Sequence, residues 1–464
     1  MNRDDIATEP ETGADDATYA LDRKAIAAIL FAVDMEDKAQ LTALMEPLHA
    51  ADIADILEQI NAYDRIRLIR LYDREFDGDI LSELDESIRE EVISVLRPQV
   101  LADAVRELES DDVVDLVEDL GEPQQEAILD ALEEADRIAV EQSLAYPEYS
   151  AGRLMQREVV MAPEHWTVGE TIDFLRSSDN LPEHFYHVVL VDPRLHPVGN
   201  VTLGQLMRSR REVALGDLTE DLFQVIPATQ DEGEVAYAFN QYHLISAPVV
   251  DEEGRLVGVI TIDDAMIVLD EEHEEDILRL AGVGEESSLA DRVISTTRRR
   301  FPWLAVNLVT AILASLVIAQ FDAAIGQIVA LAVLMPIVAS MGGNAGTQSL
   351  TVAVRAIATK DLTGSNVWRV IRREVLVGVI NGMIFAIVMG VVGWIWFGSL
   401  ALGYVIAAAM VINLVVAGFA GTVIPVLLDR IGVDPALASG AFVTTVTDVV
   451  GFFAFLGLAA VVLL

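Results

Sequence analysis

The stretch AFVTTVTDVVGFFAFLGLAAVVLL, residues 441–464, decides the fold of the protein. It is long and apolar enough to cross a bilayer, which takes about 20 helical residues. Asp448 interrupts the apolar run, and a carboxylate at the bilayer centre costs roughly 2.5–3.5 kcal/mol on insertion scales. Such a residue usually faces a pore or a polar partner. The alternative is a neutral, hydrogen-bonded Asp448 that ties helices together.

Four more stretches before this one are long enough to span a membrane, so five spans are predicted. The second, which contains Pro336 and the run Gly342–Thr347, is too long for one simple span, and we expect a broken helix there. Close helix packing is a second role open to Gly342, Gly343 and Gly346. Irregular backbone at membrane depth is tolerated only where it is buried in protein or lines water. The predicted spans cover roughly residues 301–321, 323–354, 375–397, 400–428 and 436–464.

Lys and Arg residues in the short connections predict the orientation. Arg298–Arg300 precede the first span, five basic residues lie between the second and third, and Arg430 lies between the fourth and fifth. The connections near Asp322 and Ser399 carry none. The N-terminus is therefore expected inside and the C-terminus outside. Five spans exclude two equal inverted halves in one chain, and if a central pathway exists, two chains could form it.

Charge divides the chain into two parts. The formal net charge is −43, and residues 291–464 hold ten Lys/Arg and seven Asp/Glu, so the acidity lies in the first 290 residues. Salt adaptation is one explanation; the other is a surface that repels itself unless cations bind it. Nucleic acid is an unsuitable partner. The chain has no cysteine, which excludes disulfides, thiolate metal sites and cysteine catalysis.

Oxygen-bearing side chains accompany the carboxylate of the fifth span. Hydroxyls in the same span and amides in the second span belong to Thr444, Thr445, Thr447, Asn344 and Gln348. Hard cations prefer oxygen ligands, and magnesium gives up its water reluctantly. One carboxylate per chain with hydroxyls and carbonyls therefore suits a cation held with most of its waters.

The soluble half has two patterns. Residues 22–148 place apolar residues three and four apart, which predicts a helical-repeat array. Residues 150–270 contain a repeat with an offset of 59, in which Asp192, Gly199 and Thr202 recur as Asp251, Gly258 and Thr261. Each copy predicts strand, turn, strand and helix. The repeat resembles a tandem pair of CBS domains.

The CBS resemblance implies ATP or another adenosine nucleotide as a ligand, bound by a Thr and an Asp after the last strand. The second copy has Thr261 and Asp264, whereas the first has Thr202 and then Gln205. Residues 268–297 follow as an acidic helix and linker. This segment is either a solvated linker or a lever, whose repulsion from the acids of the domains before it falls when divalent cations bridge them.

The order of these parts resembles the MgtE family of magnesium channels. The resemblance rests on Tyr149–Met155, Gly342–Ser349, Gly432–Leu437 and Thr447–Gly451, and it covers nearly the whole chain after residue 22. It implies a multidomain fold with an all-α N-terminal domain, an α+β CBS pair and a five-helix membrane domain. The predicted division is a disordered tail (1–21), the acidic helical N-terminal domain (22–148), the first CBS domain (149–213), the second CBS domain (214–267), the acidic connecting helix and linker (268–297) and the membrane domain (298–464).

The resemblance implies a homodimeric, magnesium-selective channel of a prokaryotic plasma membrane that high cytoplasmic Mg²⁺ closes. The predicted pore residues are Asp448, Asn344, Thr444 and Thr447. The predicted regulatory magnesium ligands are Asp111, Asp115, Asp264, Glu272, Glu275, Asp276 and Asp434.

Other functions remain open at this point. A secondary transporter, or a broader divalent-cation pathway for Co²⁺ or Mn²⁺, is the main alternative; an exchanger usually needs a second intramembrane carboxylate. An intramembrane aspartyl protease needs two aspartates on separate spans, and Asp448 has no such partner in the sequence, so we do not expect an enzyme. An anion pore would not place a carboxylate in its path.

Overall fold

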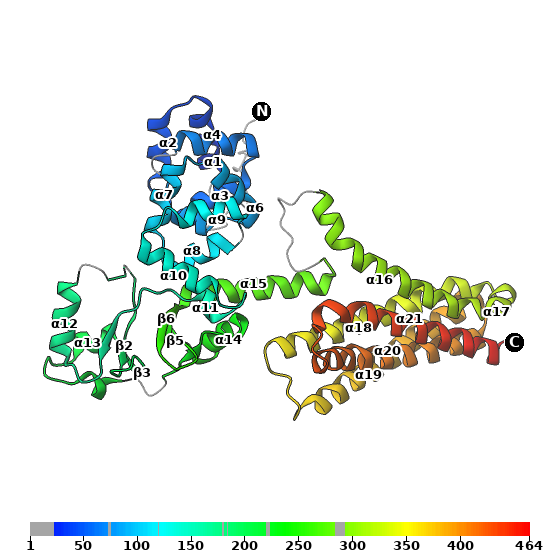
Figure 1. Ribbon diagram of the computed structural model, residues 1–464. Coiled ribbons are helices and arrows are strands. Elements are labelled where there is room, and N and C mark those ends of the chain that lie inside the picture. The colour runs from blue at the N-terminus through cyan, green and yellow to red at the C-terminus, as the bar shows by residue number, and fades with distance from the viewer. Residues whose placement is uncertain are drawn as a thin grey trace, which may run out of the picture. The chain divides into compact units, whose positions relative to one another are not determined.

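The computed structural model describes residues 23–72, 76–118, 120–178, 181–182, 184–219, 223–283 and 293–464 (Figure 1). The chain forms two compact units, Met1–Asp270 and Glu271–Leu464. The tail predicted at residues 1–21 lies outside the described residues.

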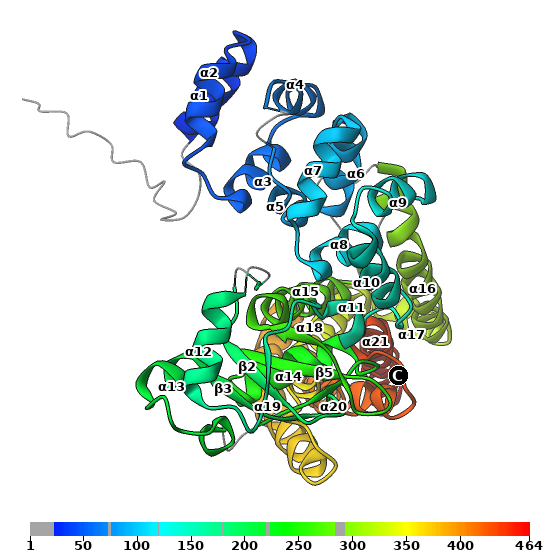
Figure 2. The ribbon, with the colours of Figure 1, turned by 60° about the vertical axis from the view of Figure 1, so that its left-hand side comes forward.

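Short helices make up the first part of the first unit, as the apolar spacing predicts, and Figure 2 shows them following one another in steps. Their apolar faces meet in one continuous core. The helices are α1 (Arg23–Asp34), α2 (Lys38–Met45), α3 (Ala50–Gln59), α4 (Ala62–Tyr72), α5 (Asp79–Ser82), α6 (Glu86–Val95), α7 (Pro98–Glu107), α8 (Ser110–Glu118), α9 (Glu122–Leu129) and α10 (Glu134–Leu144).

A buried arginine recurs in this array after 24 residues. Arg65 in α4 and Arg89 in α6 each donate two hydrogen bonds to carbonyl oxygens at the end of the preceding helix. Each also forms an ion pair with a later helix, Arg65 with Glu91 and Arg89 with Asp115. The guanidinium groups thus satisfy helix-end carbonyls that would otherwise lack partners. The hydrogen bonds and ion pairs of these two arginines therefore join successive helices of the array, which apolar periodicity alone does not reveal.

The CBS part of the first unit contains two three-stranded sheets of the same construction. In each, the first strand pairs in parallel and the third pairs antiparallel with the middle strand. The first copy contains β1 (Met161–Pro163), α12 (Val168–Ser177), β2 (His187–Val191), β3 (Pro197–Thr202) and α13 (Leu203–Arg208), preceded by α11 (Ala151–Leu154). The second contains β4 (Ile226–Pro227), α14 (Glu232–Tyr242), β5 (Ser246–Val250), β6 (Leu256–Thr261) and α15 (Ile262–Ala281), preceded by η2 (Leu215–Leu218).

The repeated residues have structural reasons. Gly199 and Gly258 lie opposite Leu190 and Val249, at matching places in the two sheets. A Cβ on Gly199 would lie 2.5 Å from Thr219 Cγ2, and one on Gly258 would lie 2.6 Å from the sulfur of Met155. Each glycine therefore makes room for a segment that leads into the other copy. The tandem architecture is confirmed, although the exact domain boundaries stay predictions.

No break separates the second CBS copy from the segment that follows it. Helix α15 runs without interruption from Ile262 to Ala281 across the predicted boundary at residue 267. The acidic run from Asp270 to Asp276 is thus part of the same helix as Asp264. Residues 284–292 of the predicted linker lie outside the described part of the chain.

Among its described residues, the second unit holds five helices that are long and apolar enough to cross a membrane, as the sequence predicts. They pack mainly around α20, which contacts α18, α19 and α21. The helices are α16 (Val293–Ala319), α18 (Ala330–Ala358), α19 (Val367–Phe397), α20 (Leu400–Arg430) and α21 (Pro435–Val462), and a short α17 (Asp322–Gln327) precedes α18.

The expected break within the second span is wrong in its position. Helix α18 is continuous through Pro336 and the run Gly342–Thr347, and the interruption lies instead at Ile328–Val329, between α17 and α18. Two glycines of the run serve the close helix packing that the sequence also allows: a Cβ on Gly342 would lie 2.1 Å from Asn413, and one on Gly346 would lie 2.7 Å from Val443.

Candidate ion path and acidic clusters

Asp448 lies within the membrane-spanning part of α21. It is the tenth residue of the apolar stretch Ser439–Val462, and its side chain is half-buried in the single chain. A charge at this depth is costly unless it meets water or a polar partner. One side of Asp448 therefore remains available to a surface outside this helix bundle.

Helix α18 carries a polar stripe at the same level. Asn344, Thr347, Gln348 and Thr351 are exposed in the single chain and follow the i, i+3, i+4, i+7 spacing of one helix face. The hydroxyls of Thr347 and Thr351 donate to carbonyl oxygens one turn earlier, at 2.9 and 3.0 Å. Apolar surface is what lipid accommodates, so a polar stripe on a membrane helix indicates contact with water or protein.

The contact between α18 and α21 brings the polar stripe of α18 and Asp448 of α21 close to each other. Gly346 of α18 faces Val443 and Thr447 of α21, so the two helices meet within a turn of both Asn344 and Asp448. The predicted pore residues from two distant parts of the sequence are therefore brought to one depth in the bundle.

The two threonines differ in their placement. Thr444 is half-buried, one turn before Asp448, and its hydroxyl donates to Gly440 O at 2.9 Å. Thr447 is fully buried, and its hydroxyl donates to Thr444 O at 3.0 Å. Burial inside one chain keeps Thr447 away from any surface that a second chain lines. The predicted pore role of Thr447 stays a prediction; within the single chain its side chain packs inside the bundle.

An acidic cluster joins α8 to the start of α15 within the first unit. It consists of Glu109, Asp111, Asp112 and Asp264. The Asp264 carboxylate accepts hydrogen bonds from Thr261 Oγ1, at 2.6 Å, and from the Asp111 carboxyl group. Two carboxylates share a hydrogen bond only when one of them holds a proton.

Burial and like charges act together on this cluster. Burial raises the pKa of Asp111 well above its usual range, and the charges of Asp264, Asp112 and Glu109 raise it further. Burial likewise raises the pKa of Glu109 and of Asp112 to about 7, and that of Asp264 to about 6. The cluster resists holding its full negative charge, so protons or bound cations must neutralise it near neutral pH.

Asp115 has a different environment from its neighbours. Its carboxylate pairs with Arg89 at 2.9 Å, and its side chain is 60% exposed. The regulatory role of Asp115 stays a prediction. Its ion pair with Arg89 links α8 to α6 within the helical array. Glu109, which the sequence reading passed over, belongs to the cluster in its place.

A second acidic group lies where α15 ends, within the second unit. Arg279 pairs with Glu275 at 2.7 Å and with Asp434 at 3.0 Å. Asp434 also caps α21, since its Oδ1 accepts from Ala436 N at 2.7 Å. Burial raises the pKa of Asp276, the charge of Asp434 raises it further, and Arg279 opposes both effects. The end of α15 is thus fastened to the start of the helix that carries Asp448.

Apolar contacts reinforce this fastening. Leu280 packs against a cluster formed by Leu350 and Val354 of α18 and by Ala436 and Val443 of α21. Glu272, in contrast, is exposed on α15. In the described ranges, no three acidic or histidine side chains converge closely enough to hold a metal ion.

Glu374 is a second carboxylate inside a membrane helix, and the sequence reading missed it. Helix α19 begins at Val367, eight residues before the predicted third span, so Glu374 lies within it. Ser349 of α18 donates to Glu374 Oε2 at 3.0 Å. The preceding arginines made this segment read as a loop, whereas it is the first part of a long helix.

The CBS pair has a polar cavity of about 450 Å³ between its two copies. It is lined by the first copy's Thr202 and Gln205 and by Tyr242 and Ser246 of the second, together with His187, whose Nδ1 lies 2.6 Å from Ser246 Oγ. Thr261 and Asp264, the predicted nucleotide residues, do not line it and are engaged with each other and with Asp111. The nucleotide-binding role of Thr261 and Asp264 stays a prediction, and the cavity lies instead beside the equivalent position of the first copy.

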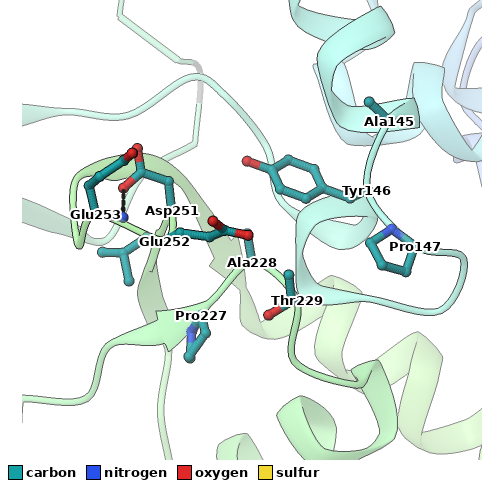
Figure 3. Close-up of a pocket in the computed structure, with 10 residues that line it drawn as sticks. Ala145, Tyr146, Pro147, Pro227, Ala228, Thr229, Asp251, Glu252 and Glu253 are labelled. Atoms are coloured by element: carbon teal, nitrogen blue, oxygen red, sulfur yellow. Dashed lines mark hydrogen bonds between the residues drawn. The ribbon is translucent and has the colours of Figure 1, made fainter.

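Figure 3 shows another recess, of about 390 Å³, at the entrance to the CBS pair. Tyr146 and Pro147 form one wall, and the turn Asp251–Glu253 lies opposite. Asp251 already accepts two backbone N–H groups of its own turn and pairs with Arg255. Its side chain is thus committed to the turn, and we assign the recess no ligand.

Family models match three parts of the chain. They are the MgtE divalent cation transporter at residues 335–458, the MgtE intracellular N domain at 48–149, and the CBS domain at 215–271. The magnesium transporter MgtE of Enterococcus faecalis (strain ATCC 700802 / V583) is 33% identical over 328 residues, which are 71% of this chain and 72% of that protein. The chain belongs to the MgtE family of magnesium transporters.

Other MgtE proteins are also similar to this chain. The magnesium transporter MgtE of Bacillus subtilis (strain 168) is 29% identical over 417 residues, which are 90% of this chain and 92% of that protein. A crystal structure of the cytosolic domain of the Mg²⁺ channel MgtE in complex with ATP is 28% identical, with a TM-score of 0.49; the match covers 52% of this chain and 99% of that one. MgtE proteins are multi-pass membrane transporters, and magnesium transport is not an enzyme class.

Proposed function

We propose that two copies of this chain form a magnesium-selective channel that imports Mg²⁺ down its electrochemical gradient and closes when cytoplasmic Mg²⁺ is high. The polar stripe of α18 beside Asp448 carries the proposal. Membrane helices do not present such a stripe to lipid. A second copy that covers this face would enclose a path lined by Asn344, Thr444 and Asp448.

The donor chemistry suits magnesium. The proposed path offers one carboxylate per chain with hydroxyl, amide and carbonyl oxygens, and it has no sulfur or imidazole. Magnesium keeps several of its waters and is usually held by one or two carboxylates. Two copies of Asp448 would therefore bind a hydrated ion without stripping it. The membrane potential contributes about 2.3 kcal/mol per charge per 100 mV, hence roughly twice that for a divalent ion.

The two acidic groups support the proposed regulation. Glu109, Asp111, Asp112 and Asp264 form a buried oxygen-rich cluster whose charge needs neutralising. The end of α15, with Glu275, Asp276 and nearby Asp434, touches the start of α21. High cytoplasmic Mg²⁺ would bridge such carboxylates and hold α15 in place, which closes the path. At low Mg²⁺ their repulsion would release α15.

We infer a cytoplasmic N-terminus and an outer C-terminus in a prokaryotic plasma membrane. The basic residues that support this lie before α16, around the α18–α19 connection and at the end of α20. The soluble unit and the end of α15 would then meet cytoplasmic Mg²⁺, as the proposed feedback requires. We also propose the domain boundaries that the sequence predicts, with the membrane domain at residues 298–464.

Glu374 favours a second candidate, a cation–proton exchanger. Exchangers usually carry a second carboxylate in the membrane, and Glu374 in α19 supplies one. It lies only two turns into a helix of 31 residues, however, so it sits near one membrane surface rather than at the depth of Asp448. This placement favours the channel.

We also propose that the CBS cavity at Thr202 and Gln205 takes the adenosine nucleotide. Its size and mixed polar lining suit such a ligand. Addition of ATP to the full-length protein should raise its thermal stability, and Tyr242→Ala should abolish that rise. Thr261→Ala, outside the cavity, should leave it intact; the opposite pattern would return the ligand to Thr261.

Reconstitution in liposomes tests the main proposal. Mg²⁺ influx, followed with an enclosed indicator, should respond to an imposed membrane potential in the wild type. It should be lost or become unselective in Asp448→Ala. Flux driven by a pH gradient at zero voltage, and lost in Glu374→Gln, would favour the exchanger. Normal influx in Asp448→Ala would remove Asp448 from the path.

A further inference from the structure

One amide lies at the centre of the membrane bundle. Asn413 of α20 is fully buried, and its Nδ2 donates to the carbonyl oxygen of Val338 in α18 at 2.8 Å. Its Oδ1 is buried without a hydrogen-bond partner among the described residues. The amide therefore spans two helices with a single directional bond.

Two glycines make the space for this amide. A Cβ on Gly342 of α18 would lie 2.1 Å from Asn413 Nδ2, and one on Gly451 of α21 would lie 2.7 Å from the same atom. In both cases the three nearest atoms all belong to Asn413. Three helices thus converge on one side chain, and both glycines exist to accommodate it.

These contacts lie next to the proposed ion path. Gly342 is two residues before Asn344, and Gly451 is three residues after Asp448. Val338, which accepts the hydrogen bond, is two residues after Pro336. Proline has no N–H for the helix ladder, so α18 has one intrahelical hydrogen bond fewer just before Val338.

Stability alone does not explain an asparagine at this position. A buried amide oxygen without a partner lowers stability, whereas an apolar side chain of similar size has no such penalty. The hydrogen bond from Asn413 adds direction: it fixes the rotation of α18 about its axis and its height along α20. Apolar packing specifies both less strictly.

We propose that Asn413 is a positioning residue for ion selection. It sets the register of α18 through Val338 and Gly342 and that of α21 through Gly451, and it thereby places Asn344 and Asp448 against the passing ion. It does not itself contact the ion. The inference rests on the proposed ion path along these two helices.

Asn413→Leu is the main test. Leucine has a similar size but no amide, so the variant should fold and melt close to the wild type in a lipid nanodisc. In liposomes, the Mg²⁺ concentration for half-maximal influx should rise about tenfold, the lower end of the effect of losing an outer-shell partner at a metal site. Unchanged half-saturation in a folded Asn413→Leu would overturn the proposal, because a purely structural role alters stability and leaves the ion affinity intact.

Glycine variants make the test independent of how leucine packs. Gly342→Ala should reduce the folded yield, and Asn413→Ala in the same chain should restore it, because all the close contacts of the new methyl come from Asn413. The folded double variant should still show the raised half-saturation. Wild-type half-saturation in this double variant would also overturn the proposal.

Gly346→Ala is the matched control on the same helix. Its methyl would meet Val443 and Thr447 rather than Asn413, so Asn413→Ala should not restore its folded yield. Restoration of both glycine variants alike would show a general loosening of the bundle and contradict the assigned contact. A wild type that carries no Mg²⁺ would instead refute the proposed function, so the two failures are distinguishable.

Discussion

The two units of this protein use carboxylates in opposite ways. In the first unit, Glu109, Asp111, Asp112 and Asp264 are crowded together, and burial and neighbouring negative charges raise the pKa of Glu109, Asp111 and Asp112. In the membrane unit, Asp448 stands among hydroxyls and apolar residues at mid-span. In the proposed function, the crowded cluster would bind a cation to relieve its own repulsion, whereas the single carboxylate would attract a hydrated ion and release it.

This difference assigns the two roles in the proposed function. A sensor has to hold magnesium long enough to fix a conformation, which neighbouring carboxylates would achieve by drawing together around the ion. A conducting site has to bind weakly enough for the ion to leave.

Asp448→Asn should reduce Mg²⁺ influx about tenfold or more, because the path loses its charge while the side chain keeps its shape. The measurement is voltage-driven influx into liposomes. Asp361→Asn, in the exposed α18–α19 connection, is the matched control and should conduct normally. Normal influx through Asp448→Asn would mean that the carboxylate has a neutral, structural role.

Asp111→Asn combined with Asp264→Asn should raise the cytoplasmic Mg²⁺ concentration for half-closing by about tenfold, because the cluster loses two ligands. Influx at low Mg²⁺ should stay near the wild-type rate. The exposed Asp217→Asn serves as the control. If the double variant closes at the wild-type Mg²⁺ concentration, the cluster is not the sensor.

Arg279→Gln should have a smaller effect on the same curve. It removes the ion pairs that fasten α15 to Asp434, and partly exposed pairs contribute about 0.2–1 kcal/mol. Half-closing should therefore need about two- to fivefold more Mg²⁺. Arg137→Gln, which breaks a comparable pair in α10, should change nothing. Easier closing in Arg279→Gln would show that Arg279 competes with magnesium.

The acidic cluster should also make stability depend on pH when divalent cations are removed. Its folded pKa values, about 6 to 7 for Glu109, Asp112 and Asp264, lie above the usual carboxylic range. The folded state therefore binds more protons than the unfolded state, and stability falls as pH rises through the folded values. The full-length protein in EDTA should melt at a higher temperature near pH 5.5 than near pH 7.5. The double asparagine variant should show less of this difference.

The sequence predicted the architecture well because its signals are local. Apolar length identified the five spans, and the 59-residue repeat identified the paired sheets. The prediction failed where a residue's meaning depends on a distant neighbour. The sequence leaves Gly342 open between a helix break and close packing, because Asn413, the side chain that it accommodates, is 71 residues away.

Prediction of the candidate site residues was limited in the same way, because their roles also depend on residues that are distant in the sequence. Asp448 stood out because it is polar in an apolar run, whereas Thr447 looked equivalent to Thr444 until packing separated them. The choice of Thr261 over Thr202 followed a sequence pattern, but α8 engages one of these equivalent positions and leaves the other beside a cavity. Glu374 was hidden by the arginines before it.

Control of the ion path by cytoplasmic magnesium is the central claim, and one measurement tests it most directly. Wild-type protein is reconstituted in liposomes, and its voltage-driven Mg²⁺ influx is measured while Mg²⁺ on the cytoplasmic face is varied. The account predicts influx that falls steadily as cytoplasmic Mg²⁺ rises. Influx that stays the same at every cytoplasmic Mg²⁺ concentration would contradict it.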